Sequence, residues 1–194
     1  FSRNGSIHYI CMDWRHILEL TTAANGIYDT FMNLCVWNKD NGGMGSFYRS
    51  KHELIFVYKH GNNKHINNFE LGQYGRYRTN VWDYPSANSL KGKDDALGEH
   101  PTPKPVDMVA DAIIDCSHPK QAILDLFLGA GSALIACEKT QRNMYAQEIS
   151  PQYCDLSVRR WLKYMQKNDL PYKVKLNGRE LIDTELEVYY QCIK

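Results

Sequence analysis

The sequence predicts an α/β fold whose sheet is mainly parallel, with helices on both faces. The second half of the chain alternates short apolar runs with stretches of helical apolar periodicity, which is typical of a doubly wound sheet. A glycine turn at residues 129–131 joins one of these apolar runs to a helical stretch. The 194 residues are 43% hydrophobic and 23% charged, so the chain can form one domain with a buried core.

The first half is expected to contain three strands and one helix. The helix covers residues 14–24, with Asp13 as its N-cap. The expected strands are rich in β-branched and aromatic residues and cover residues 6–12, 34–38 and 53–58. A Gly-rich loop between the last two strands is too long for a tight hairpin turn. Residues 60–99 show no sustained period, and a loop of this length is usually functional or disordered.

From Pro105 onward the pattern becomes regular. Pro105 suits the first turn of a helix, and so does Pro151, which follows a capping Ser150. The run 122–128 is apolar, which predicts a strand buried on both faces. In the helix that begins at Pro151, Cys154, Val158, Trp161 and Met165 share one face, and most of the cations Arg159, Arg160, Lys163 and Lys167 are expected off it. In this half, helices are expected over 105–116, 132–140 and from 151 onward, and strands over 122–128, 143–147 and 187–193.

Charge and cysteine content narrow the class of protein. Residues 41–93 contain eight Lys or Arg and three acidic residues, a net charge of +5, on a chain whose overall net charge is +1. This basic, aromatic-bearing segment indicates either a surface for a polyanion or a solvated loop with incidental charge. The six cysteines form no Cys-x-x-Cys pair, so we expect free thiols in a cytoplasmic protein, without a zinc site or a disulfide framework. The sequence contains no run of about 18 apolar residues, so it predicts no membrane span.

The glycine turn has the features of a site for a nucleoside-type ligand. Gly129 and Gly131 allow the backbone to come close to a ligand, and the start of the next helix offers free N–H groups. Glu148 ends the following strand, where a carboxylate can accept both hydroxyls of a ribose. A dinucleotide is disfavoured, because Leu134 occupies the place of the third glycine and Asp125 would repel a pyrophosphate. An ordinary strand–turn–helix junction is the structural alternative.

Three motifs taken together resemble a known family. They read HPTPKPVDMVADAI from residue 100, ILDLFLGAGSALIA from residue 123 and NMYAQEISPQYCDLSVRRW from residue 143. In this order they resemble the amino-methyltransferases that modify DNA bases at exocyclic nitrogens, in the subgroup often called beta-type, over nearly the whole chain. The resemblance implies a Rossmann-like methyltransferase sheet. It divides the domain into residues 1–59 from the catalytic sheet region, a candidate target-recognition region at 60–99, and an S-adenosylmethionine-binding half at 100–194.

The resemblance also implies a role for each matching position. S-adenosylmethionine would be held by Asp125, Phe127, Gly129, Ala130, Gly131, Glu148, Ile149, His100, Thr102 and Lys104. Double-stranded DNA, with the target base turned out of its stack, would be contacted by Tyr48, Arg49, Lys51, Arg76 and Arg78. Core packing would also explain Phe127 and Ile149, and Thr102 could simply cap the next helix.

The catalytic motif of the family, an acidic or polar residue followed by Pro-Pro and an aromatic residue, is not in the sequence. SPQY at 150–153 follows the strand of the ribose carboxylate, and DLPY at 169–172 follows a helix, so both are rejected. The motif is expected upstream of Phe1. One central strand, between the cofactor strand and residues 6–12, is therefore expected to be missing, and the chain alone is expected to be inactive.

The leading interpretation is a site-specific DNA amino-methyltransferase of a restriction–modification system or a phage, with adenine N6 favoured over cytosine N4. Two alternatives stay open. A dinucleotide-dependent oxidoreductase would fit the spacing of the glycines and the acid, and a DNA-binding remnant without catalytic activity would fit the missing motif.

Overall fold

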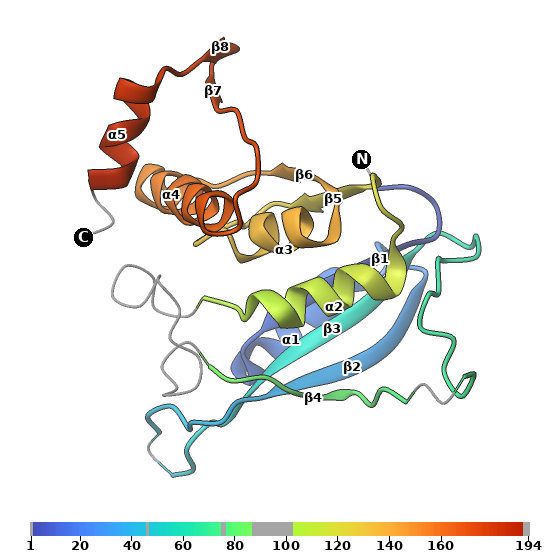
Figure 1. Ribbon diagram of the computed structural model, residues 1–194. Helices are drawn as coiled ribbons and strands as arrows, with labels where there is room; N and C mark the ends of the chain where they lie inside the picture. Colours follow the sequence, from blue (N-terminus) through green and yellow to red (C-terminus); the bar gives the residue numbers. More distant parts are fainter. Residues whose placement is uncertain (1, 46, 75–76, 87–102, 192–194) are drawn as a thin grey trace. The chain divides into compact units, whose positions relative to one another are not determined.

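The computed structural model describes residues 2–45, 47–74, 77–86 and 103–191 (Figure 1). The chain divides into two compact units. The first contains Phe1–Lys93 and Asp111–Pro119, and the second contains Asp94–Ala110 and Lys120–Lys194. Helix α2 (Val106–Cys116) therefore contributes residues to both units. Each helix in the described ranges is too short or too polar to cross a lipid bilayer.

A four-stranded sheet organises the first unit. It consists of β1 (Ser6–Met12), β2 (Thr30–Asn38), β3 (His52–His60) and β4 (Val81–Asp83), in the order β1-β3-β2-β4. Strand β3 is antiparallel to both of its neighbours, whereas β4 is parallel to β2. The first three strands confirm that the predicted strands exist, although β2 begins four residues earlier than the predicted strand at 34–38. Strand β4 was not predicted, because three residues within an aperiodic loop are too few to show an alternation.

The two faces of this sheet are covered by different segments. One face packs against helix α1 (Ile17–Ala24), which follows the 3-10 turn η1 (Trp14–His16) capped by the Asp13 side chain. The core on this face consists of Ala24, Leu54, Phe56 and Tyr58. On the other face, the indole N–H of Trp37 donates to the Tyr84 carbonyl at 2.8 Å. Strand β3 is buried on both faces, which explains its continuous apolar run.

The second unit is built on two parallel strands, β5 (Ala122–Asp125) and β6 (Asn143–Ala146). Helix α3 (Ser132–Thr140) joins them and covers one face, where Cys137 Sγ lies 3.6 Å from Met144 Sδ. On the other face, Leu124 and its neighbour Tyr145 are 52% and 62% exposed. The prediction of a strand over 122–128 buried on both faces was therefore wrong in length and in burial.

Strands β1 and β5 each lie at the edge of their sheet. Among the described residues, β1 pairs with β3 alone and β5 pairs with β6 alone. An apolar strand with one unpaired edge leaves a row of backbone N–H and C=O groups without strand partners. The expectation that a central strand is missing stays a prediction.

The C-terminal part follows helix α4 (Pro151–Lys167) with the hairpin β7 (Lys175–Leu176) and β8 (Arg179–Glu180) and ends in helix α5 (Asp183–Gln191). The predicted strand over 187–193 was wrong. The carboxylate of Glu185 accepts the N–H of Ile182 at 3.0 Å, which satisfies a donor at the start of α5. Leu186 packs with Leu162 of α4, and this burial overrides the β propensity of the Val-Tyr-Tyr run.

Candidate functional site

The glycine turn leaves β5 at Asp125 and enters α3 at Ser132 (Figure 1). Asp125 Oδ1 accepts the Phe127 N–H at 2.9 Å, which starts the bend. Gly131 has a φ of +79°, and a Cβ at this position would lie 2.7 Å from the Cβ of Ser157. Both the backbone angle and the close approach of α4 therefore require glycine here, whether or not a ligand is present.

Glu148 ties the end of β6 to the glycine turn. Its Oε2 accepts the Gly129 N–H at 2.7 Å, and its Oε1 accepts the Ser150 N–H at 2.9 Å. These hydrogen bonds hold the Glu148 carboxylate next to the backbone of the glycine turn. A carboxylate has about four lone-pair sites, so a group that accepts two backbone N–H bonds can also accept the hydroxyls of a ribose.

Two large apolar side chains beside the turn face solvent. Ile149 is 94% exposed and Phe127 is 88% exposed. The alternative that these two residues serve as core packing is therefore wrong for the described structure. Exposed apolar surface beside a carboxylate suits a ligand that has a flat apolar ring attached to a sugar.

The remaining expected cofactor residues divide into three cases. Ala130 is buried and packs against Leu156, so it presents backbone rather than side chain to a ligand. Lys104 precedes α2 and is half-buried. His100 and Thr102 lie outside the described residues.

Helix α4 contributes a residue to the turn that the sequence prediction placed on the wrong face. Arg160 is 7% exposed, its guanidinium Nη1 donates to the Ala130 carbonyl, and the same nitrogen lies 3.5 Å from Ser132 Oγ. The buried face of α4 includes Ser157 and Arg160, which lie one turn apart. The small side chain of Ser157 was the signal in the sequence that could have indicated this buried face, because it lets the glycine turn approach α4 there.

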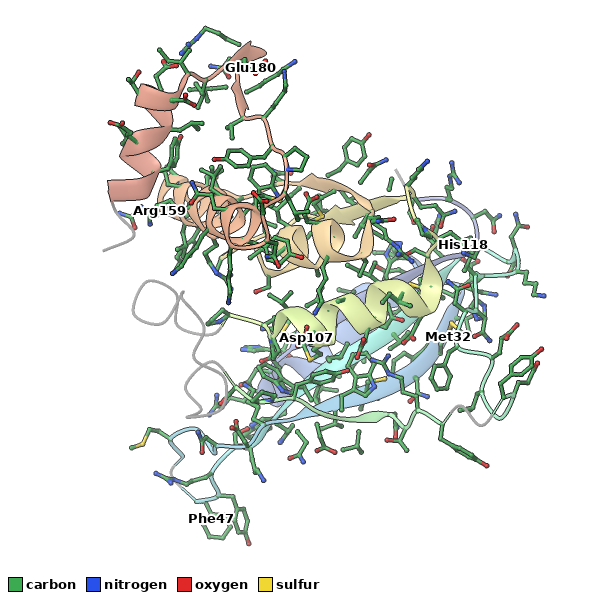
Figure 2. All side chains as sticks on the ribbon, viewed as in Figure 1. Met32, Phe47, Asp107, His118, Arg159 and Glu180 are labelled. Carbon is green, nitrogen blue, oxygen red and sulfur yellow. The ribbon has the colours of Figure 1, made fainter. Side chains whose placement is uncertain are left out.

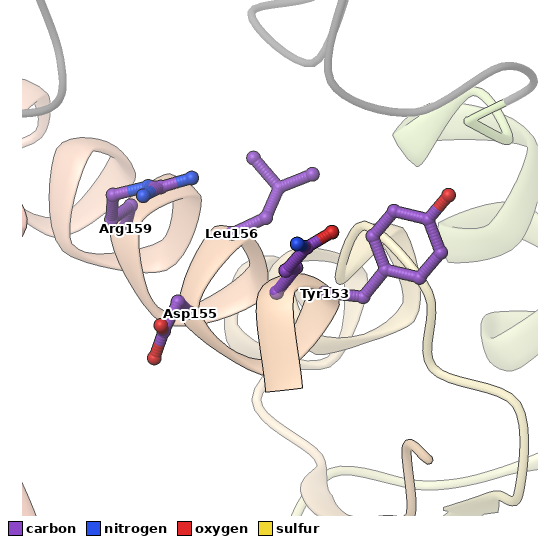
Figure 3. Close-up of a pocket in the computed structure, with 5 residues that line it drawn as sticks. Tyr153, Asp155, Leu156 and Arg159 are labelled. Carbon is purple, nitrogen blue, oxygen red and sulfur yellow. The ribbon is translucent and has the colours of Figure 1, made fainter. Parts of the chain in front are cut away.

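A pocket of about 310 Å³ lies on the amino-terminal half of α4 (Figure 3). It is lined by Gln152, Tyr153, Asp155, Leu156 and Arg159. Tyr153 and Leu156 also pack with Ala130, so the pocket adjoins the buried side of the glycine turn. None of the expected cofactor residues lines it, and we do not assign the cofactor to it.

The structure brings three of the expected DNA-binding residues together on one hairpin. The loop between β2 and β3 carries Tyr48, Arg49 and Lys51, all exposed. Its stem is closed by two backbone hydrogen bonds of 2.8 Å each, Lys39 N–H to the Lys51 carbonyl and Gly43 N–H to the Ser50 carbonyl. A single hairpin stem therefore presents an aromatic ring and two cations.

Arg78 lies elsewhere and is already engaged. Its Nη1 is 2.9 Å from Asp115 Oδ2, and its guanidinium lies 4.7 Å from the ring centre of Trp82. Burial raises the pKa of the Asp115 carboxyl, and the charge of Arg78 acts in the opposite direction. These contacts give Arg78 a structural role and argue against the expected contact with DNA. Arg76 lies outside the described residues.

Most of the described part of the candidate target-recognition region lies away from this hairpin. The Gly61 N–H donates to Asp29 at 2.5 Å and the Gly5 N–H donates to the His60 carbonyl at 2.6 Å, next to the amino ends of β1 and β2. The chain returns through β4, after which the Ser86 N–H donates to Asp40 at 2.8 Å. Among the described residues of the region expected at 60–99, Ser86, just beyond β4, thus contacts the start of the loop between β2 and β3.

The described ranges contain no candidate metal site, and two of their cysteines are buried thiols. No group of three or more His, Cys, Asp or Glu side chains there could hold a metal ion. Burial raises the pKa of the Cys35 thiol to about 11 and that of Cys137 to about 12. Both thiols therefore stay protonated near neutral pH, which does not suit a nucleophile.

The glycine turn, its carboxylate and the strand–helix alternation define a class of α/β proteins that bind nucleoside-type ligands. The family model described as DNA methylase matches residues 1–159, and the chain belongs to this family. Among the curated relatives is the Type II methyltransferase M2.MboI of Moraxella bovis. It is 26% identical over 153 residues, which cover 74% of this chain and 55% of that protein. The chain thus spans about half the length of this relative.

Solved structures show the same fold. The M1.HpyAVI–SAM complex aligns with a TM-score of 0.67 and 19% identity, over 82% of this chain and 76% of that chain. The cytosine-N4-specific PvuII DNA methyltransferase aligns with a TM-score of 0.56 and 12% identity, over 83% and 56% of the two chains. These likenesses confirm the predicted α/β, Rossmann-like methyltransferase fold.

Proposed function

We propose that the full-length protein is a site-specific DNA methyltransferase. It transfers a methyl group from S-adenosylmethionine to an exocyclic amino nitrogen of a base in double-stranded DNA, with adenine N6 favoured over cytosine N4. The observation that carries the proposal is the hydrogen bond of 2.7 Å between Glu148 Oε2 and the Gly129 N–H. It supports the proposal because a carboxylate that can accept ribose hydroxyls would then lie at a glycine turn in a chain of the DNA methylase family.

The residues at the turn fit S-adenosylmethionine. Glu148 would accept the ribose hydroxyls, and exposed Ile149 would cover one face of the adenine. Asp125 lies at the carboxyl end of β5, where its charge suits the amino group of the methionine part. When bound, the cofactor would supply a methyl group activated by its sulfonium for transfer to the base nitrogen.

The DNA side of the proposal rests on the hairpin between β2 and β3. Arg49 and Lys51 would contact phosphates, which supply most protein–DNA hydrogen bonds and fix the register of a protein on the duplex. Tyr48 would stack on a base. The group that accepts the amino protons of the target base is expected on the Asp-Pro-Pro-Tyr-type motif, which is not in this sequence.

Calorimetry with S-adenosylmethionine and with NAD tests the cofactor assignment. We expect the full-length protein to bind S-adenosylmethionine and not NAD. Glu148→Gln removes a charged acceptor, so it should weaken binding about 10- to 100-fold. Glu187→Gln, an exposed carboxylate on α5, is the matched control and should bind like the wild type. Equal affinities for the two variants would contradict the role of Glu148, and selective binding of NAD would favour an oxidoreductase.

Nucleoside analysis of treated DNA tests the reaction. Unmethylated genomic DNA is incubated with the full-length protein and S-adenosylmethionine, digested and examined by mass spectrometry. We expect N6-methyladenine, whereas N4-methylcytosine would change the assigned base. The 194-residue chain alone should give no product. Cofactor binding and DNA binding without any methylated nucleoside would favour the inactive remnant.

A further inference from the structure

The hairpin between β2 and β3 ends in an exposed apolar tip. Beyond the backbone hydrogen bond between Gly43 and Ser50, the side chains of Met44, Phe47 and Tyr48 are 88%, 86% and 81% exposed. Figure 2 shows Phe47 at the far end of this hairpin. The rings of Phe47 and Tyr48 meet edge to face, with centroids 4.4 Å apart. Large apolar groups are thus held at the end of a polar stem with little of their surface buried.

The glycines of this loop make the tip narrow. A Cβ on Gly45 would collide with the Tyr48 carbonyl, and one on Gly42 would lie 3.2 Å from the Arg49 Cβ. Glycine therefore lets the two arms of the hairpin run closer together than other residues would allow. A narrow arm with rings at its end has the shape of a side-chain wedge.

The position of the tip matches the side of the sheet where ligands bind. Strands β1 and β2 are both antiparallel to β3, so they run in the same direction. Their last residues, Met12 and Asn38, pair with Leu54 and His52 at the start of β3, which is where the hairpin loop ends. In α/β folds, ligands bind outside the carboxyl ends of the strands.

The charges on the stem indicate which partner fits the tip. Exposed Arg49 and Lys51 follow the apolar rings on the same arm of the hairpin, and the surrounding segment is the basic part of the sequence. An apolar tip followed by two cations complements a ligand with negative charges outside and stacked rings inside. Duplex DNA has this arrangement, and proteins that bend it insert Phe or Met between base steps.

We propose that Phe47 and Tyr48 enter the base stack of duplex DNA beside the target position as a wedge. This inference rests on the proposed methyl transfer to a base, because such a base must first leave its stack at a cost of a few kcal/mol. Stacking on the inserted rings offsets that cost and fills the gap. Arg49 and Lys51 hold the adjacent phosphates.

Binding to DNA with and without a preformed gap tests the wedge. Fluorescence anisotropy compares the full-length protein on two duplexes of the same sequence, one fully paired and one with an abasic site. The wild type should bind the abasic duplex about tenfold more tightly, because no base has to be unstacked there. The double variant Phe47→Ala, Tyr48→Ala should bind both duplexes equally. Leu18→Ala, which removes an exposed apolar side chain from α1, is the control and should keep the preference.

A second measurement uses the reaction itself. Once methylated products have identified the target sequence, the double variant should methylate the paired target about tenfold more slowly than the wild type. Pairing the target base with a mismatched partner should restore most of this loss. An equal loss on both substrates, or an abasic preference that survives in the double variant, would overturn the wedge. If no methylated product forms, the methyl-transfer proposal fails, but the preference for the abasic duplex still tests the wedge. The two proposals can therefore fail independently.

Discussion

At the scale of single residues, the cofactor turn depends on a guanidinium from the helix behind it. Arg160 donates to the Ala130 carbonyl from a buried position, while Glu148 accepts the N–H of the neighbouring Gly129. The peptide groups of the turn are thus held from two sides by groups of opposite charge. We infer that Arg160 positions the turn without touching the ligand.

Comparing Arg160→Met with Arg159→Met should distinguish the effect of the Arg160 hydrogen bond from the effect of removing one positive charge from α4. The variant leaves the Ala130 carbonyl without its buried donor, so we expect a loss of about 1–3 kcal/mol of unfolding free energy and weaker cofactor binding. Arg160→Lys keeps one donor and should restore part of the cofactor affinity. Denaturant unfolding and calorimetry measure the two effects. Arg159→Met is the control, and equal results for the two methionine variants would contradict the role of Arg160.

A pH effect on stability is expected from His8. Its Nε2 lies 2.7 Å from Ser2 Oγ and its Nδ1 lies 2.9 Å from the Tyr28 hydroxyl. Burial, with a smaller effect of His60, lowers the pKa of His8 below 6.5. The unfolded chain therefore binds the proton more tightly. The stability that neutral His8 contributes is present above pH 6.5 and is lost as the pH falls through the lower pKa of the folded state.

His8→Gln should flatten this dependence. The melting temperature of the wild type is expected to fall more than that of the variant between about pH 7.5 and about pH 5.5. His16→Gln, at an exposed position on η1, is the control and should keep the wild-type slope. A slope for His8→Gln as steep as that of the wild type would assign the pH dependence to other groups.

At the scale of elements, the short strand β4 is held in the first unit by side-chain contacts of the residues around it. Arg78 bonds to Asp115 of α2, Tyr84 donates to Asp111 at 2.5 Å, and Trp37 of β2 donates to the Tyr84 carbonyl. These contacts lie on both sides of the three residues of β4. They order a stretch that has no secondary-structure signal of its own.

Arg78→Met and Arg49→Gln should therefore affect different properties. The side chains of Arg78 and Asp115 are 20% and 21% exposed, so removing Arg78 should cost about 1–3 kcal/mol, less than for a fully buried pair. Arg49 is exposed, and its loss should leave stability unchanged but lower the salt dependence of DNA binding by about one unit of slope. Urea unfolding and DNA affinity at several salt concentrations measure both. A reduced salt slope in Arg78→Met would restore Arg78 to the DNA surface.

At the scale of the whole molecule, the parts that follow a repeating pattern could be predicted from the sequence. The alternation after Pro105 and the three motifs were sufficient for the fold class and the family. Tertiary contacts decided the rest. The strand predicted over 187–193 is helical as far as Gln191, in a helix held by the packing of Leu186 on Leu162. Arg160 is buried because it donates to a carbonyl, which no periodicity reveals. Arg78 looked like a surface cation because its partner Asp115 lies 37 positions further along the chain.

The close packing of Gly131 against Ser157 also limits how this chain can vary during evolution. A Cβ at 131 would lie 2.7 Å from the Ser157 Cβ, and the φ of +79° disfavours any side chain there. A larger residue at 157 would push α4 away from the turn and carry Arg160 with it. We therefore expect descendants of this chain that keep a working site to retain glycine at 131 and a small residue at 157, even where the surrounding surface of α4 diverges freely.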